Sequence, residues 1–318
     1  MTLSSGRNEY LDALKGVGII LMVIGHVQSP IRDFIFSFHM PLFFFISGYL
    51  FKDRDSTDIL KRNWKKVLIP YLLTCIAIWL FMALLHKYTW GLSIFLANGS
   101  ESVWGFEGYS VGPLWFLVCY SVSLLLFHYL LKIRSVDLQL CSLIGFWVLA
   151  YLIKQQFGLQ PLGLLNAIPA CFCLWMGYIT RSENARRYLL SPYSISIGLC
   201  IWILCLWRGS VSMASFVYKL WFLQIVGAYY ATWLIYKAII TIKKLSGGGY
   251  LSGIGKASLP LLCVHSVDYM FNISTAIVTH LHIIGVMAIL LNMIFKLLFV
   301  FIGYQFIIRI PILQKIYC

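Results

Sequence analysis

Two ionisable residues in the first apolar stretch of the chain could carry out chemistry inside a membrane. Lys15 and His26 are eleven residues apart, which in an α-helix is close to three turns, so both lie on one face about 16 Å apart along the axis. Ionisable groups within a span usually face the bundle interior or a water-filled cavity. This arrangement suits a long anionic donor whose reactive end reaches His26, although a structural helix–helix hydrogen bond is the alternative for this histidine.

A second histidine opens the next apolar stretch. His39 precedes Pro41, and only a short segment separates it from His26. If the first stretch runs outward, both histidines lie in its outer half or at its outer end. Because histidine titrates near neutrality, two neighbouring imidazoles could share general-base and orienting roles. The alternative is that His39 only caps a helix that starts at a proline.

The composition indicates which elements must position these residues. The chain has 318 residues, of which 60% are hydrophobic and 11% are charged, against about 25% charged in ordinary soluble domains. Only helices or a closed barrel satisfy the backbone in lipid. The apolar runs 67–85, 114–131 and 283–308 are near-continuous and lack the alternation of barrel strands. The sequence therefore predicts an all-α, polytopic integral membrane protein with about ten transmembrane helices.

We expect one transmembrane domain over residues 1–318, since no internal repeat and no long extramembrane segment is visible. The expected spans are 13–29, 34–51, 66–86, 112–131, 138–154, 163–180, 191–207, 216–240, 259–279 and 283–308.

The net charge of +14 follows membrane topology and does not require a nucleic-acid partner. Eighteen of the 25 lysines and arginines fall on one side of the expected spans: Arg7 and those in 52–66, 132–134, 181–187, 237–256 and 309–315. Only five fall on the other side. Since positive residues favour the cytoplasm, both termini are expected there. The nine cysteines, an odd number without CxxC spacing, argue against a disulfide framework or a zinc site, so no metal is expected.

Two loops have suggestive compositions. The longest outer loop, 86–111, carries Glu101 and Glu107 among several aromatic residues. Aromatic faces and carboxylates suit sugar binding, but an interfacial aromatic belt is the alternative. The segment GGGYLSGIGK at 247–256 looks like a phosphate-binding loop but lacks the required first glycine and the final Ser or Thr. A flexible hinge before a helix is the expected structure.

Several segments in order carry a resemblance to a known family. They are NEYLDALKGVGIILMVIGH, FSFHMPLFFFISGYLFK, KRNWKKVLIPY, GPLWFL, MGYITR and GIGKASLPLLCVH. Together they resemble the membrane-bound acyltransferase-three family, which O-acetylates bacterial surface sugars. That family shows a basic residue, ten residues and then a histidine. Lys15 and His26 fit this spacing, with lysine where many members have arginine.

The resemblance implies a catalytic His26, with Lys15 as its basic partner, in the bacterial cytoplasmic (inner) membrane. Acetyl-CoA would enter from the cytoplasm. Its phosphates need cations, and Arg62, Lys65 and Lys66 are candidates, with Arg62 favoured because it lies in a matching segment. Ordinary positive-inside topology is the alternative for this cluster.

A carbohydrate or glycolipid acceptor would approach near Trp115 and the loop with Glu101 and Glu107. His26 would deprotonate a sugar hydroxyl or take the acetyl group first, and the sequence does not separate these routes.

His265 and Asp268, one turn apart, could orient a group, line the donor path or form a structural hydrogen-bonded pair. Because their span starts in the cytoplasm, His265 is expected nearer the inner leaflet than His26, without direct contact. A competing function is export or flipping of a polysaccharide or lipid-linked sugar. Transporters often show inverted repeats, whereas no internal repeat is visible in this sequence. The residues that match the family gather around Lys15, His26 and His39, which favours a reaction centre over transport.

Overall fold

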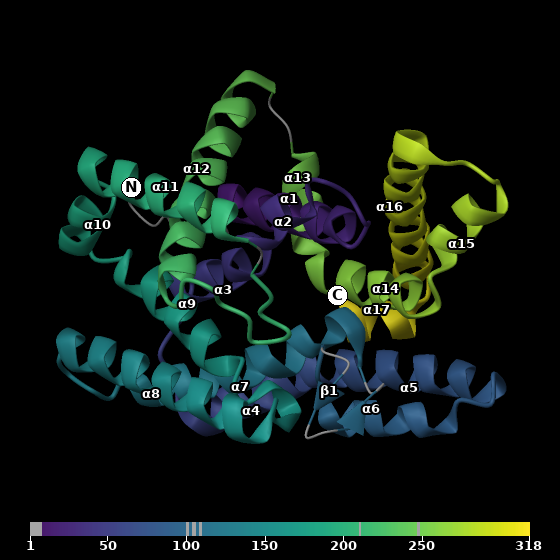
Figure 1. Ribbon diagram of the computed structural model, residues 1–318, viewed down its shortest axis with the longest axis horizontal. Helices are drawn as coiled ribbons and strands as arrows, with labels where there is room; N and C mark the ends of the chain where they lie inside the picture. The colour runs from purple at the N-terminus through teal and green to yellow at the C-terminus, as the bar shows by residue number, and fades with distance from the viewer. Residues whose placement is uncertain (1–7, 100–101, 104–105, 108–109, 210, 247–248) are drawn as a thin grey trace.

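The protein is helical apart from one short hairpin (Figure 1). The computed structural model describes residues 8–99, 102–103, 106–107, 110–209, 211–246 and 249–318. Strands β1 (Ser102–Val103) and β2 (Phe106–Glu107) pair antiparallel, with Ser102 opposite Glu107 and Val103 opposite Phe106. The all-helical class expected from the sequence is confirmed.

The helices follow one another along the whole chain. In order they are α1 (Glu9–Gly25), α2 (Arg32–Phe36), α3 (His39–Tyr49), α4 (Ser56–Asn63), the π-helix η1 (Trp64–Leu68), α5 (Ile69–Leu84), the 3-10 helix η2 (Tyr88–Gly91), α6 (Leu92–Leu96), the 3-10 helix η3 (Gly112–Leu114), α7 (Trp115–Leu130), α8 (Val136–Phe157), the 3-10 helix η4 (Pro161–Gly163), α9 (Ala167–Ile179), α10 (Glu183–Leu189), α11 (Pro192–Arg208), α12 (Leu223–Ser246), α13 (Tyr250–Lys256), α14 (Ser258–Phe271), α15 (Ile273–His280), α16 (Gly285–Arg309) and α17 (Pro311–Tyr317).

Within the described residues, six helices are long and apolar enough to cross a membrane, or up to eight if each bent pair is one span. The bent pairs are α10 with α11, at 58°, and α14 with α15, at 49°. Asn272 makes the second bend with a left-handed φ of 50°. The chain is thus a polytopic membrane protein, as expected.

The first two expected spans fall below crossing length even when each bent pair is counted as one span. α1 has 17 residues and α3 has 11, against about 20 for a full crossing. Between them the chain turns through residues 26–31 and forms the short α2. His26 therefore lies at the C-terminal end of α1 and His39 at the first position of α3, so both histidines lie at helix ends.

Two glycines fix α1 against α13. A Cβ added at Gly16 would overlap the carbonyl of Leu251, and one at Gly255 would overlap the carbonyl of Asp12. Small residues of this kind let helix backbones approach closely in membranes. The expectation of a flexible hinge is thus wrong for residues 250–256, which form helix α13, packed against α1. Residues 247 and 248 lie outside the described part.

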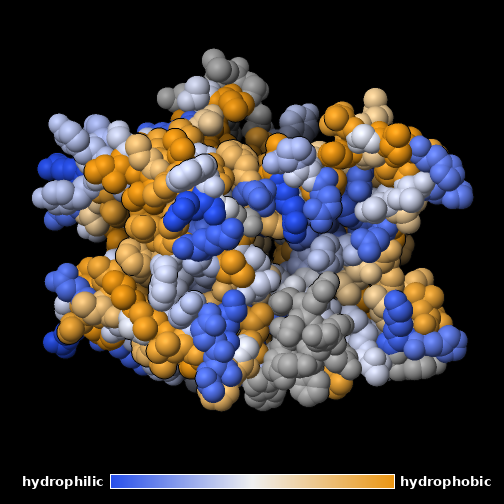
Figure 2. Space-filling view, in the orientation of Figure 1, coloured by the Kyte–Doolittle hydropathy of each residue, from blue (hydrophilic) through white to orange (hydrophobic). Residues whose placement is uncertain are grey.

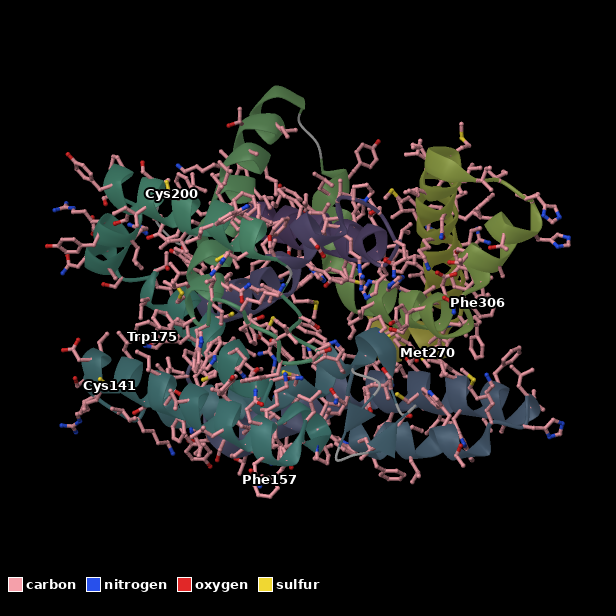
Figure 3. All side chains as sticks on the ribbon, viewed as in Figure 1. Cys141, Phe157, Trp175, Cys200, Met270 and Phe306 are labelled. Carbon is pink, nitrogen blue, oxygen red and sulfur yellow. The ribbon has the colours of Figure 1, made fainter. Side chains whose placement is uncertain are left out.

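Glycines also let α3 pack closely against α9, which is buried along most of its length. Gly48 of α3 meets the carbonyl of Leu174, and Gly177 of α9 meets that of Phe45. α9 is buried at Ala167 and continuously from Pro169 to Gly177, as expected for a helix that is apolar all round. Trp175, labelled in Figure 3, donates from Nε1 to Gln139 Oε1 of α8 at 2.8 Å.

The outer faces of the helices suit lipid. In α16 the buried residues are Lys296, Val300 and Ile307, whereas large apolar side chains such as Phe301 and Phe306 are exposed. Figure 2 shows hydrophobic side chains over large areas on both sides of the molecule, with hydrophilic side chains across the middle and at the left and right edges. The exposed apolar faces leave the polar groups of α1, α14 and α16 turned inward, where the candidate site lies.

Candidate active site

His26 is held by its own helix. Its Nδ1 lies 2.7 Å from the carbonyl oxygen of Met22, one turn earlier. Because a carbonyl oxygen only accepts hydrogen bonds, Nδ1 carries the ring proton and Nε2 keeps its lone pair. The ring is half-buried. His26 therefore presents an unprotonated nitrogen, which a general base or a nucleophile requires.

The ring of His26 lies among other aromatic rings. The ring centroids of His265 and Tyr269 lie 4.9 Å and 5.1 Å from it, and that of Phe36 lies 5.6 Å away. His265 is fully buried, and neither of its ring nitrogens has a hydrogen-bond partner among the described residues. This imidazole is thus directly beside the ring of His26 without a protein partner of its own.

The expectation that His265 would not reach His26 is therefore wrong, and the packing of α13 explains the error. Gly255 contacts α1 at Asp12 and Gly16, so the helical stretch that leads to His265 begins level with the middle of α1. His265 is ten residues after Gly255, and His26 is ten residues after Gly16. At 1.5 Å per residue the two rings arrive at about the same height.

His39 repeats the arrangement of His26. Its Nδ1 lies 3.0 Å from the carbonyl oxygen of Ile35, which again assigns the proton to Nδ1. Phe36 stacks on the His39 ring at 4.9 Å and also lies near His26. The structure brings both histidines to the wall of one cavity of about 240 Å³, which we call the histidine cavity and which Trp115 also lines.

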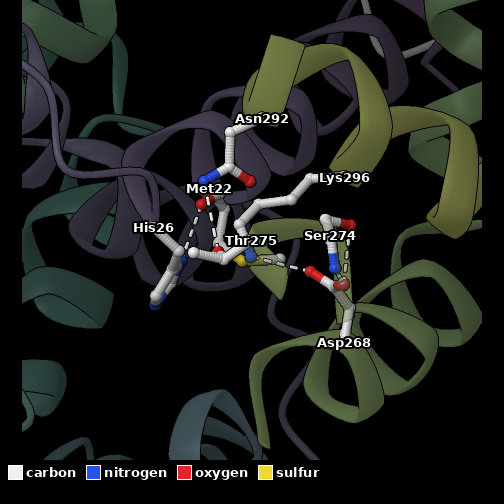
Figure 4. Close-up of polar contacts among 7 residues, drawn as sticks. All are labelled: Met22, His26, Asp268, Ser274, Thr275, Asn292 and Lys296. Atoms are coloured by element: carbon white, nitrogen blue, oxygen red, sulfur yellow. Dashed lines mark hydrogen bonds and ion pairs between the residues drawn. The ribbon is translucent and has the colours of Figure 1, made fainter. Parts of the chain in front are cut away.

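A buried ion pair lies beside His26 (Figure 4). Lys296 Nζ of α16 donates to Asp268 Oδ2 of α14 at 2.7 Å, and the side chains are 3% and 0% exposed. Asp268 Oδ1 accepts from the backbone N–H of Ser274 at 2.8 Å and from its hydroxyl at 2.7 Å. Asp268 is thus bonded to α15 and α16, and within the described residues His265 makes no hydrogen bond to it. A structural His265–Asp268 pair is not what the fold contains.

Four cavities form a series, because each shares lining residues with the next. A basic cavity of about 550 Å³ and an inner cavity of about 220 Å³ share Lys15, Ser47 and Tyr120. The inner cavity shares Met22, Met40 and Leu262 with the histidine cavity. A polar cavity of about 620 Å³ shares His26, Gln28 and Tyr269 with the histidine cavity. His26 therefore lies where the last two cavities meet.

The basic cavity collects most of the cations expected to bind the donor. Its lining includes Lys15, Lys52, Arg54, Arg62 and Lys66. Lys15 also lies 3.4 Å from Asp12 Oδ1, so its charge is partly balanced. The structure places Lys65 elsewhere, in an apolar groove on a different side of η1. Lys15 thus lies where the first two cavities meet, and His26 lies where the last two meet.

The residues expected at the acceptor side are only partly described. Trp115, at the start of α7, is 5% exposed and lines the histidine cavity. Glu101 lies outside the described residues, and for Glu107 only the backbone position in β2 is described. Trp90 lines the polar cavity, and its Nε1 donates to the Ser110 carbonyl at 3.1 Å. In the part of the chain that is described, no group of three or more His, Cys, Asp or Glu is placed to hold a metal.

Comparison with known proteins decides the family. Residues 8–307 match a family described as an acyltransferase domain, which is nearly the whole chain. The chain belongs to the acyltransferase-three family. The resemblance found in the sequence is confirmed, and the acyltransferase domain takes up most of this polytopic membrane protein.

Two relatives of this chain carry the name nodulation protein NolL. The protein from Mesorhizobium japonicum is 26% identical over 195 residues, covering 52% of this chain and 49% of the relative. The protein from Sinorhizobium fredii is 26% identical over 228 residues, covering 64% of this chain and 57% of the relative. The chain thus spans about half the length of these relatives. No solved structure matches it significantly.

Three residues near His26 escaped the sequence reasoning: His265 as its direct neighbour, and Asn292 and Lys296 as lining of the polar cavity. Lys296 had a usable signal, because it is an isolated lysine deep within the apolar run 283–308, and charges in spans usually mark functional or paired positions. Its partner is 28 residues away, and only the fold shows which carboxylate that is.

Proposed function

We propose that this acyltransferase moves an acetyl group from cytoplasmic acetyl-CoA to a hydroxyl of a sugar in the bacterial envelope, either in a surface polysaccharide or in a glycolipid. The observation that supports this most is the series of cavities that joins a cluster of cations to the free Nε2 of His26. A long donor with an anionic end and a reactive thioester end needs a path of this form.

The donor would enter through the basic cavity. The phosphates of acetyl-CoA would bind Lys52, Arg54, Arg62 and Lys66, because charge-assisted hydrogen bonds to phosphate are strong. The slender arm of the donor would then pass Lys15 into the inner cavity, whose lining is largely apolar and includes Met22 and Met40. The thioester would reach the histidine cavity beside His26.

His26 would perform the chemistry by one of two routes. In direct transfer, Nε2 takes the proton of the sugar hydroxyl while the oxygen attacks the thioester carbonyl. In the two-step route, Nε2 attacks the thioester first and forms an acetyl-imidazole, which the sugar hydroxyl then resolves. Both routes need the lone pair on Nε2 that the Met22 contact provides. His39 would orient the reacting groups, since it lines the histidine cavity together with His26.

The acceptor would occupy the polar cavity. Its lining combines amides and hydroxyls, such as Gln28, Asn292 and Thr275, with the indole of Trp90. Such groups bind sugar hydroxyls, and an aromatic ring can stack against a sugar ring. We place both termini and the basic cavity in the cytoplasm, because most lysines and arginines lie on that side. The polar cavity then faces the envelope side of the bacterial inner membrane.

The test is transfer of radiolabelled acetyl from acetyl-CoA in inner-membrane vesicles that retain native glycans. Vesicles would contain the wild type, His26→Ala, Lys15→Ala or His280→Ala, each quantified by immunoblot. His280 is an exposed histidine at the end of α15 and is the matched control. We expect labelled carbohydrate with the wild type and His280→Ala, and loss of at least about 100-fold with His26→Ala, since general bases contribute about 10²–10⁴.

The outcomes separate the alternatives. Full labelling by His26→Ala would remove the catalytic assignment. Absence of labelled carbohydrate with the wild type, together with wild-type-dependent export of a glycan, would support the transport function instead. Label retained on the denatured wild-type protein but absent from His26→Ala would select the two-step route over direct transfer.

A further inference from the structure

The buried lysine in the last long helix is placed where the reaction needs a positive charge. Lys296 lines the polar cavity together with His26. It also lies within electrostatic range of both His26 and His265. In the view of Figure 4, its side chain extends from α16 between His26 and Asp268. Acyl transfer creates a negatively charged oxygen close to the general base. A cation that lines the same cavity as His26 would stabilise that oxygen.

Asp268 holds that cation in one orientation. Both of its oxygens are occupied, Oδ1 by the N–H and hydroxyl of Ser274 and Oδ2 by Lys296. Asp268 itself does not line the polar cavity, whereas Lys296 does. An ammonium has three N–H donors, and only the one to Asp268 has a partner among the described residues. The remaining donors are available to a bound group in the cavity.

Stability alone is a weak reason to keep this pair. A buried ion pair contributes little net stability, because removing two charges from water offsets their attraction, and apolar replacements of both partners are often neutral or stabilising. The bond from Ser274 to Asp268 already secures the bend between α14 and α15 without a lysine. The cation therefore needs a further explanation.

The same face of α16 carries a second group that points to a ligand. Asn292 is one turn before Lys296 and therefore on the same side of the helix, and it also lines the polar cavity. Its Nδ2 donates to Thr275 Oγ1 at 3.2 Å. Its Oδ1 is buried without a hydrogen-bond partner in the described structure. A hydroxyl of an acceptor could donate to this oxygen, which would put the acceptor between Asn292, Lys296 and His26.

We propose that Lys296 stabilises the oxyanion of the tetrahedral intermediate during acyl transfer, and that Asp268 positions Lys296 for this task. The inference rests on the proposed function. In the direct route, a hydroxyl oxygen bonds to the acyl carbon, its proton moves to Nε2 of His26, and the carbonyl electron pair moves to oxygen beside the Lys296 ammonium. The carbonyl then re-forms, the carbon–sulfur bond breaks, and the CoA thiolate takes the proton from His26.

The test measures initial rates of acetyl transfer from labelled acetyl-CoA to native glycans in vesicles containing Lys296→Met. Removing one oxyanion donor typically lowers kcat by about 10²–10³. We expect a loss of that size with a KM for acetyl-CoA within about threefold of the wild type, since an interaction made only in the transition state lowers kcat alone. Lys132→Met, which removes a cation stacked on Tyr129 away from the polar cavity, is the control and should keep wild-type rates.

A double variant separates a chemical role from a structural one. Lys296→Met alone leaves Asp268 buried and unpaired, so the protein itself could be destabilised. Lys296→Met with Asp268→Asn removes both charges while the amide oxygen can still accept from Ser274. We expect the double variant to regain the unfolding temperature of the wild type in detergent and to remain as inactive as Lys296→Met. Recovery of transfer by the double variant would overturn the inference, because only the structural role predicts it.

Failure of the inference and failure of the proposed function give different results. Wild-type vesicles that transfer no acetyl would refute the proposed function, and the role of Lys296 would fall with it. Active wild-type vesicles with undiminished kcat in Lys296→Met would refute the role of Lys296 alone. A rise in KM without a fall in kcat would also refute it, since Lys296 would then bind the ground state only.

Discussion

At the scale of single residues, His26 has an assigned ring proton and its neighbour His265 has none. The Met22 carbonyl fixes the proton of His26 on Nδ1, whereas His265, 4.9 Å away between ring centroids, has no partner for either nitrogen in the described structure. An unpaired buried polar group costs about 1–3 kcal/mol. We therefore expect that His265, beside His26, finds its partner when substrates are bound.

His265→Phe tests this reading of the buried ring. We expect the unfolding temperature in detergent to stay equal or rise, because phenylalanine keeps a ring of similar shape and removes the two unpaired nitrogens. We expect kcat to fall by at least about tenfold, because the ring beside His26 can no longer bond to a substrate group or stabilise the proton on His26. Thermal unfolding and acetyl-transfer rates on the same preparation check both expectations.

His39→Phe is the comparison variant, since Nδ1 of His39 already has a partner in Ile35. Losing that bond without relieving an unpaired group should lower the unfolding temperature. If His265→Phe instead behaved like wild type in both stability and kcat, the ring would serve packing only.

At the scale of elements, the site depends on how close α13 comes to α1. Gly16 and Gly255 bring the two backbones into contact, and this sets the height at which His265 meets His26. The near-continuous apolar runs of the sequence located most of the spans, because such runs form helices in lipid when they lack the alternation of barrel strands. It did not give the register between helices, because that depends on contacts between residues such as Gly16 and Leu251, more than 200 positions apart.

The same limit explains what was found and what was missed at the site. Lys15 and His26 belong to one helix, so their spacing of eleven residues fixed their relation. Lys296 and Asp268 belong to different helices, α16 and α14, which pack against each other after the chain has bent at Asn272. Local geometry can be predicted from a periodic pattern, whereas a pair formed across a bend requires the fold.

Gly255→Ala should separate α13 from α1. The added Cβ would overlap the Asp12 carbonyl, and overpacking of this kind typically costs about 1–3 kcal/mol. We expect a lower unfolding temperature in detergent and reduced acetyl transfer, because His265 and His26 would no longer lie at the same height. Gly145→Ala in α8 is the matched control, since no atom lies within 4 Å of its added Cβ. Unchanged stability in Gly255→Ala would contradict the close packing of α1 and α13.

At the scale of the whole molecule, the cavities are polarised from a cationic end to an uncharged hydrogen-bonding end. Lys52, Arg54, Arg62 and Lys66 line the first cavity, and amides, hydroxyls and Trp90 line the last. The only lysine or arginine that lines the polar cavity among the described residues is Lys296, which Asp268 partly neutralises. An anionic donor and an uncharged acceptor would thus enter from opposite ends and meet at His26.

This polarity predicts that replacing Arg62 and Lys66, which line the basic cavity, changes the KM for acetyl-CoA, and that replacing the neighbouring Lys65 does not. Arg62→Gln combined with Lys66→Gln should raise the KM for acetyl-CoA about tenfold, because each exposed cation contributes roughly 0.2–1 kcal/mol to an ion pair, and should leave kcat unchanged. Lys65→Gln removes one positive charge directly before Lys66, but Lys65 lies in the apolar groove and outside the basic cavity, so the KM of this variant should match the wild type. Added salt should raise the wild-type KM toward that of the double variant, because mobile ions screen exposed charges. An equal rise in KM for Lys65→Gln would mean that diffuse positive charge at the membrane surface attracts the donor, and that the basic cavity does not bind its phosphates.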